Sequence, residues 1–573
     1  MDTIIKNLFR IFAVSFYPVV LVLLFIFVLN RKEYYNTLKK NIRYILFNTV
    51  LISSISIVVI FVFFKYENMI YSYDYAGHWV RALEMRDLFF SNPFEMFPRL
   101  YQSMNYSDYS YLPSIVLLPI TIINTSYGFF CIGNFVMFIL PTVILLEILY
   151  YSKFDNHKLL PFVIYIIYYP LYFGLFFGEV DCSGLIFIVY SLIILFFKPA
   201  DELKTFEIIS INLSTFMLLF LRRYYLFYIA VMYILFLIKT LISYHRQKNK
   251  KVLLNALLSG IVALIVILTF FMPYTQNVLG NNYSEAYEVY DRNNKISAFL
   301  NYFSYISISV ILYSLLINLK EKKYNVLYLL VMVISICLLF WRTQAFEYHH
   351  YNLITIPILF LFSSGIYSLM QNYKYLGKII IILLTIQSSN IFLNFTSKDF
   401  IIFTSLRKQP EIFWGIDEFK ELSSYLSSLT EGEGQTIFMA TGSSIFNYDL
   451  IQNANLPDIS NKPKFEAKTF DIRDGLPKDL EYIRYIIISD PIQYINSDYQ
   501  HMFDVVTNAI LNEPLVSDIY TKINEYTISG IHVMIFEKTG EFTPAIKEYF
   551  YNQMINYYPD KTELFSYILD PYN

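Results

Sequence analysis

Residues 43–64, RYILFNTVLISSISIVVIFVFF, decide the fold class of this chain. After Arg43, the stretch contains no charged side chain, no glycine and no proline. A helix needs about 20 consecutive apolar residues to cross the hydrocarbon core of a bilayer. The sequence therefore predicts that this stretch spans a membrane.

Similar stretches recur along the first two thirds of the chain. The hydrophobic fraction is 56%, the charged fraction is 16% and the mean hydropathy is +0.45, which is more apolar surface than a soluble protein of this size can bury. We therefore expect a polytopic α-helical protein of the cell membrane. The apolar runs predict about twelve spans, at 9–29, 43–64, 128–150, 159–177, 184–198, 207–220, 224–241, 252–273, 299–318, 325–341, 351–370 and 378–394.

The basic residues of the short connections predict the orientation, because loops rich in Lys and Arg stay in the cytoplasm. One further apolar run, 112–124, is short and contains two prolines. If this run does not cross, the basic clusters at 246–251 and 320–323 lie on the cytoplasmic side. We therefore expect 112–124 to lie on or dip into the outer leaflet, and 66–127 to form a long first outer loop. The N-terminus is then also outside.

The tail, residues 395–573, is a different kind of sequence. It holds 14 basic and 26 acidic residues, a net charge of −12, so the rest of the chain carries 30 − 20 = +10 and the total is −2. This charge excludes a strongly basic nucleic-acid-binding protein. Helices and strands alternate in the tail, which predicts an extracytoplasmic α/β domain. The predicted helices are 417–429, 441–455 and 502–511, followed by an amphipathic terminal helix, and the predicted strands are 436–440, 485–489 and 531–537.

Acidic residues at the outer edge of the membrane are candidates for chemistry, because charges at membrane depth are costly. Asp74 follows the second span closely and could accept a proton from an attacking hydroxyl, with His78 one helical turn away to orient it or to contact substrate. The alternative is an interfacial helix cap. Glu179 and Asp181 share a short outer turn that could bind a cation or substrate hydroxyls, or could simply be solvated.

Basic residues on the outer side contradict the charge rule that the other loops obey. Arg222, Arg223 and Arg342 therefore indicate an anionic partner such as phosphate. The competing interpretation is an internal ion pair with Glu179, Asp181 or Glu347. His349 and His350 point about 100° apart on a helix, which favours phosphate contacts or hydrogen bonds over metal ligation.

Together these features resemble the GT-C membrane glycosyltransferases, including the protein mannosyltransferase-like and aminoarabinose transferase-like enzymes. The resemblance covers roughly 43–394 and is strongest over 66–190. One departure is the pair Asp74-Tyr75, where many members have Asp-Glu, and this weakens the case for a two-acid metal site. The features that carry the resemblance are the outer acid Asp74, Tyr111-Leu112-Pro113 before the apolar run, the turn Gly178-Glu179-Val180-Asp181, the outer Arg222-Arg223-Tyr224 and the outer tail.

The resemblance implies that residues 1–394 form a catalytic domain for glycan biosynthesis in the cell envelope. Such an enzyme transfers a sugar from a polyprenyl-phosphate donor to a lipid, glycan or cell-wall acceptor on the outer face, with inversion. The resemblance implies Asp74 as base and assigns a catalytic role to Asp181, with Glu179 beside it on the substrate. It assigns no cofactor, with a divalent cation as the remaining candidate. The implied phosphate-binding residues are Arg222, Arg223, Arg342, His349 and His350.

Other classes of function stay open. A secondary transporter has a similar number of spans, but it usually shows internal repeats and helices broken by Gly or Pro, and the chain has only 17 glycines. A polysaccharide polymerase or ligase shares the polyprenyl donor, but a large outer loop late in the membrane region is typical of it. A membrane scaffold without activity is the third alternative. The abundance of Ile, Asn, Tyr, Phe and Lys is typical of an AT-rich, bacterial genome.

Overall fold

The computed structural model describes residues 2–573 except 108, 154–157, 198–202, 248–249, 281–294, 324, 395–401, 431–434, 460–461, 464, 471–474, 495–499 and 570–573. Parts of the predicted connections 66–127, 246–251 and 274–298, and the first residues of the predicted tail, thus lie outside the described residues. The chain divides into two compact units. The first comprises Met1–Tyr66 and Gly77–Pro410, and the second comprises Glu67–Ala76 and Glu411–Asn573.

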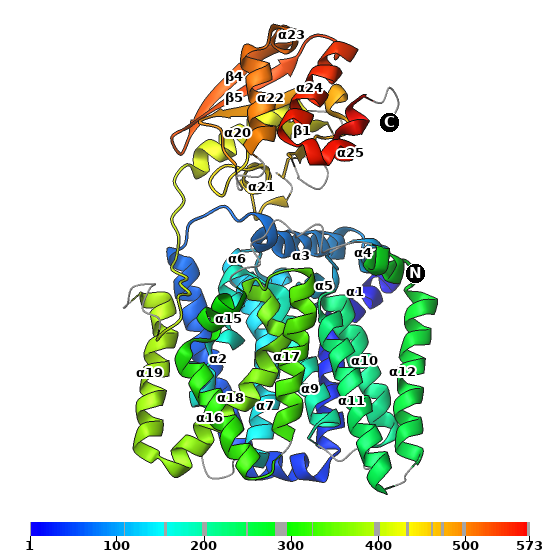
Figure 1. The fold of residues 1–573 in the computed structure, drawn as a ribbon, viewed down its shortest axis with the longest axis vertical. Coiled ribbons are helices and arrows are strands. Elements are labelled where there is room, and N and C mark those ends of the chain that lie inside the picture. The colour runs from blue at the N-terminus through cyan, green and yellow to red at the C-terminus, as the bar shows by residue number, and fades with distance from the viewer. Residues whose placement is uncertain are drawn as a thin grey trace. The chain divides into compact units, whose positions relative to one another are not determined.

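The first unit is built from helices (Figure 1). Its α-helices are α1 (Asp2–Leu29), α2 (Lys32–Tyr66), α3 (Tyr73–Ser91), α4 (Met96–Tyr106), α5 (Leu112–Ile123), α6 (Tyr127–Asn134), α7 (Leu140–Lys153), α8 (Leu160–Ile167), α9 (Leu185–Leu195), α10 (Thr205–Leu221), α11 (Tyr225–Gln247), α12 (Lys250–Phe270), α13 (Met272–Gly280), α15 (Lys295–Phe303), α16 (Tyr305–Lys320), α17 (Asn325–Thr343), α18 (Asn352–Asn372) and α19 (Lys374–Leu393). Between them lie a π-helix, η1 (Phe135–Ile139), and the 3₁₀ turns η2 (Tyr169–Leu171), η3 (Phe173–Phe177), η4 (Val180–Gly184) and η6 (Tyr348–Tyr351).

The membrane character expected from the sequence is supported by the lengths of these helices. Within the described residues, seven helical stretches are long and apolar enough to cross a membrane, and α15 and α16 together make an eighth candidate that is bent by 88°. Four further described helices are apolar but shorter, so the full count of twelve spans stays a prediction. The seven stretches are Ile4–Leu29, Lys32–Tyr66, Tyr127–Lys153, Tyr225–Arg246, Val326–Thr343, Tyr348–Asn372 and Lys374–Leu393.

Helices α16, α17 and α18 pack side by side near the middle of the first unit, as Figure 1 shows. Helices α16 and α18 approach closely at Gly365 in α18, where an added Cβ would lie 2.4 Å from the carbonyl oxygen of Val310 in α16. Only a residue without a side chain fits there. Hydroxyl groups then link the buried faces, for example Tyr150 of α7 with Ser363 of α18 at 2.8 Å.

The run predicted to lie at the outer leaflet forms the helix α5 and is mostly buried within the first unit. It packs against α1 and α6, and eight of its twelve residues are buried. Pro113 stands in its first turn, where a missing backbone N–H costs nothing. The depth of α5 in a bilayer stays a prediction.

The second unit contains a mixed five-stranded sheet with the strand order β2-β1-β3-β5-β4. Strands β2, β1 and β3 are parallel, whereas β3, β5 and β4 are antiparallel. Its elements are α20 (Ile416–Leu429), β1 (Thr436–Met439), α21 (Tyr448–Asn453), β2 (Glu466–Lys468), η8 (Leu480–Tyr482), β3 (Tyr485–Asp490), α22 (Gln500–Asn512), α23 (Pro514–Ser517), β4 (Tyr520–Ile528), β5 (Ile531–Lys538), α24 (Pro544–Tyr557), η10 (Pro559–Lys561), α25 (Thr562–Phe565) and η11 (Ser566–Leu569).

The predicted alternation of helices and strands in the tail is confirmed, with two differences. The helix predicted over 441–455 is shorter, because α21 begins only after Asn447, whose side chain accepts a hydrogen bond from the backbone N–H of Leu450 (3.0 Å) and caps the helix. Strands β2 and β4 were not predicted. Strand β4, YTKINEYTI, lies at the edge of the sheet and lacks a regular apolar alternation.

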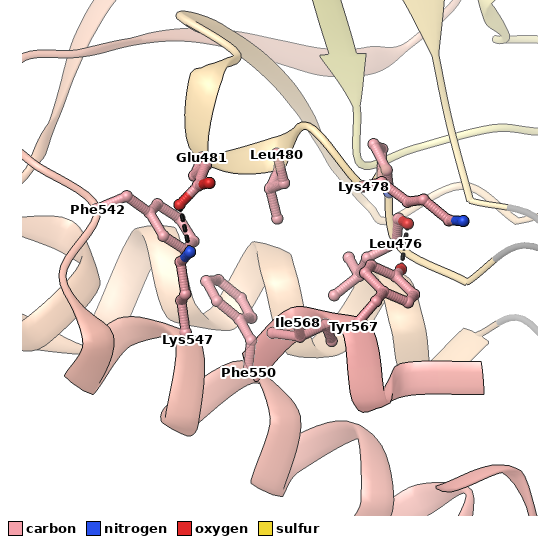
Figure 2. A pocket seen from close by; sticks show the side chains of 10 residues that line it. Leu476, Lys478, Leu480, Glu481, Phe542, Lys547, Phe550, Tyr567 and Ile568 are labelled. Atoms are coloured by element: carbon pink, nitrogen blue, oxygen red, sulfur yellow. Dashed lines mark hydrogen bonds and ion pairs between the residues drawn. The ribbon is translucent and has the colours of Figure 1, made fainter. Parts of the chain in front are cut away.

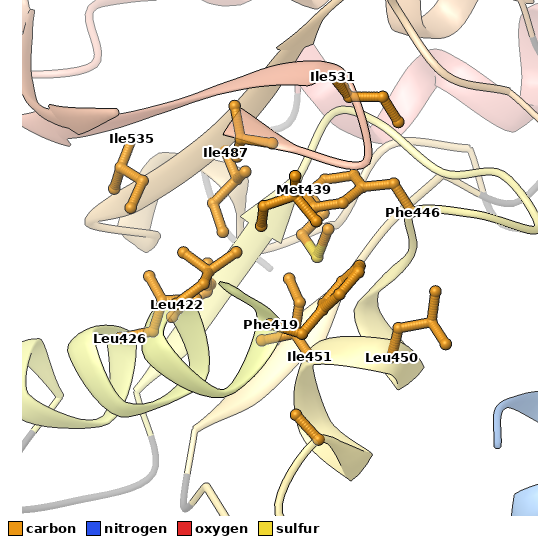
Figure 3. Close-up of a cluster of buried hydrophobic side chains, with 14 of the residues drawn as sticks. Phe419, Leu422, Leu426, Met439, Phe446, Leu450, Ile451, Ile487, Ile531 and Ile535 are labelled. Atoms are coloured by element: carbon orange, nitrogen blue, oxygen red, sulfur yellow. The ribbon is translucent and has the colours of Figure 1, made fainter. Parts of the chain in front are cut away.

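One face of this sheet is covered by α20 and α21, and Figure 3 shows the core between them. Leu422 of α20 and Ile487 of β3 are fully buried there. Ile70, which precedes α3 in the chain, is part of the same core. The second unit is therefore built from two segments that are far apart in the sequence.

Replacing Leu422 by Ala should destabilise the second unit by about 2–5 kcal/mol, because it leaves a cavity in a core with no exposed side. The measurement is the urea dependence of deuterium uptake by the β3 amides in the full-length protein. Leu515→Ala is the matched control, since Leu515 is 41% exposed in the same unit. Equal effects of the two substitutions would contradict this description of the core.

Candidate functional site

The turn that carries Glu179 and Asp181 is tightly built. Gly178 ends η3 with φ +64°, and an added Cβ would lie 2.1 Å from the hydroxyl oxygen of Tyr127. The same hydroxyl donates to the carbonyl of Phe177 at 2.9 Å. The glycine thus lets the chain reverse against Tyr127, and η4 begins two residues later with Asp181 in its first turn.

Asp181 lies at the centre of a buried polar cluster. Its Oδ1 atom accepts a hydrogen bond from the Tyr224 hydroxyl at 2.7 Å, and the same atom pairs with Nε of Arg222 at 2.7 Å. The Asp181 and Arg222 side chains are only 2% and 9% exposed. The Tyr225 hydroxyl donates to the backbone carbonyl of Asp181. Of the two interpretations of Arg222, the internal ion pair is thus present in the structure.

His78 joins this cluster from α3. Nε2 of His78 lies 2.7 Å from Nη1 of Arg222. A guanidinium group only donates hydrogen bonds, so Nε2 accepts and the ring proton is on Nδ1. Nδ1 is buried and has no hydrogen-bond partner among the described residues. Burial, followed by the positive charges of Arg222 and Arg81, lowers the pKa of His78 well below its ordinary value, so the ring is neutral.

Two guanidinium groups lie over the ring of Tyr109. The distance from the ring centroid to Cζ is 4.8 Å for Arg81 and 5.1 Å for Arg222. The Tyr109 and His78 ring centroids are 5.7 Å apart. Cation–π contact lowers the cost of placing two like charges close together in a poorly hydrated place.

Among the described residues no ion pair joins Arg81 directly to a carboxylate, although the negative charge of Glu84 acts on Arg81. The acid one turn further along α3, Glu84, instead accepts a hydrogen bond from the Tyr111 hydroxyl at 2.6 Å. Burial and this carboxylate raise the pKa of Tyr111 to about 12, so the hydroxyl keeps its proton.

Arg81 and Tyr109 were missed by the sequence analysis. Arg81 could have been found, since Asp74, His78 and Arg81 are spaced i, i+4, i+7 and so share one face of a helix. Gly77 is a second signal, because a Cβ added at this glycine would lie only 3.2 Å from Nη1 of Arg81. Tyr109 carries no local signal, because it stands in the connection between α4 and α5.

Three further predicted residues approach the cluster. Nδ1 of His349 lies 3.7 Å from Oε1 of Glu179, and the His349 carbonyl accepts a hydrogen bond from the Tyr224 hydroxyl at 3.3 Å. The His349 and His350 rings are 3.9 Å apart, and His350 contacts the Tyr224 ring edge to face. The structure thus brings His78, Glu179, Asp181, Arg222, His349 and His350 together.

The other predicted residues lie elsewhere. Arg223 donates to the carbonyl of Ser107 and lies over the Tyr274 ring. Arg342 is exposed in the last turn of α17, and none of its contacts with the described residues joins it to the cluster. Asp74, in the first turn of α3, belongs to the second unit, where its charge acts on Asp449.

No group of three or more His, Cys, Asp or Glu side chains in the described part of the chain is arranged to hold a metal ion. The divalent cation therefore stays an untested candidate. The second unit contains a small pocket, shown in Figure 2, where Lys547 forms an ion pair with Glu481 and the Tyr567 hydroxyl donates to the carbonyl of Leu476. None of the residues predicted for a site lines this pocket.

Comparison with known proteins adds no family: no family model and no curated protein sequence matches this chain. The fold and the site define a helical protein with several candidate membrane spans and a buried arginine cluster. The cluster contains an N–H of His78 without a hydrogen-bond acceptor among the described residues, and the guanidinium groups of Arg81 and Arg222 lie beside it. Such a set of groups suits an oxyanion.

His78 should make the protein less stable in acid. Because the pKa of His78 is lowered in the folded state, the unfolded chain takes up the proton first once the pH falls below about 6.5. The contribution of the neutral His78 ring to the free energy of unfolding is complete above that pH. Below it, this contribution falls by at most about 1.4 kcal/mol per pH unit. Between about pH 7.5 and pH 5.5, the melting temperature of His78→Gln should therefore fall by less than that of the wild type.

The control for this measurement is His501→Gln, which removes a histidine that is 49% exposed. This variant should follow the wild-type pH dependence. A His78→Gln profile identical to the wild-type profile would contradict the assignment of a buried neutral ring.

Proposed function

We propose that this protein is a membrane glycosyltransferase that moves a sugar from a polyprenyl-phosphate donor to an acceptor on the outer face of the membrane. The observation that supports the proposal best is the arginine cluster: Arg81 has no direct ion pair with a carboxylate among the described residues, and it lies with Arg222 over Tyr109. A lipid-linked phosphate is the kind of anion that such a cluster recognises at a membrane.

The two arginines have different roles in this proposal. Arg222 forms an ion pair with Asp181 and lies over the Tyr224 ring, so its position is fixed and its charge is largely compensated. Asp181 is then a positioning residue, because both Arg222 and Tyr224 occupy its Oδ1 atom. Arg81, which has no direct ion pair among the described residues, supplies a positive charge, and Nδ1–H of His78 supplies a hydrogen bond to a phosphate oxygen.

The reaction needs one base. The acceptor hydroxyl oxygen attacks the anomeric carbon of the sugar and its proton passes to the carboxylate of Asp74. The bond from the anomeric carbon to the phosphate oxygen breaks, and the phosphate leaves with the electron pair as an anion. Since the leaving group is a stable anion, cationic groups near it suffice without a strong acid. Asp74 shares one helix, α3, with His78 and Arg81.

A second candidate, a secondary transporter, is favoured by two observations. The helix pair α15 and α16 is bent by 88° at Ser304, and broken helices are typical of transport sites. Glu147 in α7 is 1% exposed, and the polar side chain that acts on its carboxylate is Asn48 of α2. An acidic residue at membrane depth is a common proton site in transporters. Turnover of a lipid-linked sugar separates the two candidates.

Asp74→Asn should lower transfer by about 10²–10⁴-fold, because the amide cannot accept the proton of the acceptor. The assay uses the full-length protein in nanodiscs with a panel of synthetic polyprenyl-phosphate hexoses and an envelope extract as acceptor. Free polyprenyl phosphate is measured by mass spectrometry. Asp87→Asn is the matched control, since Asp87 lies on the same helix with a half-exposed side chain. Wild-type turnover by Asp74→Asn would remove the base from the proposal.

Arg81→Gln should weaken binding of polyprenyl phosphate by about 10- to 100-fold, since a charged hydrogen bond to phosphate contributes about 1.5–3 kcal/mol. Binding is measured by native mass spectrometry of the same nanodiscs, without any acceptor. Arg86→Gln is the control, because Arg86 lies on the same helix next to Asp87. Equal affinities of the two variants would argue against a phosphate site at Arg81.

A further inference from the structure

Residues 67–76 belong to the second unit, which is called the C-terminal domain below. They precede its other segment, Glu411–Asn573, by more than 300 residues. The backbone N–H of Asn68 donates to the carbonyl of Glu411 at 2.8 Å, and the N–H of Phe413 donates to the carbonyl of Asn68 at 2.7 Å. Ile70 is 6% exposed and lies in the core of the domain. The two backbone hydrogen bonds form a parallel β-bridge between Asn68 and Ile412, and Ile70 attaches the segment to the core.

The short helix α21 holds the residues that follow. Nδ2 of Asn453 donates to the carbonyl of Tyr71 at 3.0 Å. Oδ2 of Asp449 accepts a hydrogen bond from the backbone N–H of Tyr73 at 2.7 Å. The Tyr73 and Tyr448 rings meet edge to face with centroids 6.2 Å apart. Three side chains of α21 therefore contact the chain at the start of α3.

Asp449 performs the task that an N-cap residue performs in most helices. The first N–H groups of a helix have no partner within it, and a carboxylate there gains both a hydrogen bond and a favourable interaction with the helix dipole. Tyr73 has φ +52°, an uncommon conformation for a residue with a side chain, and the contacts of α21 hold it. The next residue in the chain is Asp74.

We propose that the C-terminal domain positions Asp74, and that Asp449 is the positioning residue. The role of Asp74 as base rests on the proposed function, whereas the capture of residues 67–76 does not. Asp449 acts by fixing the first turn of α3, so that the carboxylate of Asp74 keeps one orientation.

The experiment compares Asp449→Ala with Asp449→Asn in the full-length protein in nanodiscs. The alanine variant removes the hydrogen-bond acceptor, whereas the amide oxygen of Asn keeps one. We expect Asp449→Ala to increase deuterium uptake by residues 67–76 and to lower kcat of the sugar-transfer assay by about 10- to 100-fold with KM for the donor unchanged. Asp449→Asn should restore most of both.

Two controls and one additional variant separate a positioning role from a folding defect. Uptake by the β3 amides (Tyr485–Asp490) should stay at the wild-type value in every variant, because β3 is paired on both sides, with β1 and with β5. Asp417→Ala should change nothing, since the Asp417 side chain is 96% exposed in the same domain. Asn453→Ala, which removes the second contact of α21, should act in the same direction as Asp449→Ala.

Wild-type uptake by residues 67–76 in Asp449→Ala would overturn the proposed capture. Increased uptake with an unchanged kcat would overturn the positioning role. Failure of the proposed function gives a different result: Asp74→Asn then turns over donor normally, while the uptake of residues 67–76 still decides whether α21 holds the segment.

Discussion

A guanidinium group removed from water must recover its lost hydration from the protein, and the interior of the first unit is arranged around this requirement for Arg222. Its partners are a carboxylate, an imidazole nitrogen and an aromatic ring, contributed by Asp181, His78 and Tyr109. These residues come from separate parts of the chain, so meeting the requirement brings α3, the connection before α5, η4 and the end of α10 together. Removing one partner would leave a buried charge uncompensated, which costs several kcal/mol.

The same requirement explains the glycines around the cluster. An added Cβ at Gly184 would lie 2.3 Å from Cζ of Tyr225, whose hydroxyl binds the backbone of Asp181. Together with Gly178, this glycine lets aromatic rings pack directly against the backbone of the Asp181 turn. The ion pair therefore depends on a backbone shape that few other residues at these two positions would permit.

Local patterns in the sequence were sufficient for some features and insufficient for others. Apolar runs predicted the helical first unit and the strands β1 and β3, and alternation predicted β5, because these signals depend on neighbouring residues. The Asp181–Arg222 pair was one of several pairings that charge alone allowed. Tyr109 could not be predicted, since its role depends on tertiary contacts with Arg81 and Arg222. The capture of Ile70 could not be predicted either, because two apolar residues in a connection, Met69 and Ile70, give no sign of a core formed by residues beyond 410.

The boundary between the two units falls inside α3, after Ala76. The hydrogen bond from Tyr73 to Asp449 joins residues 376 positions apart. A chain is made from its N-terminus, and domains generally fold as they appear during synthesis. Residues 67–76 must therefore wait, with Ile70 still uncovered, until nearly the whole protein has been made. Completion of the chain is thus a condition for the final shape of its first long loop, and a prematurely ended product would retain an unfinished loop that quality-control proteases could recognise.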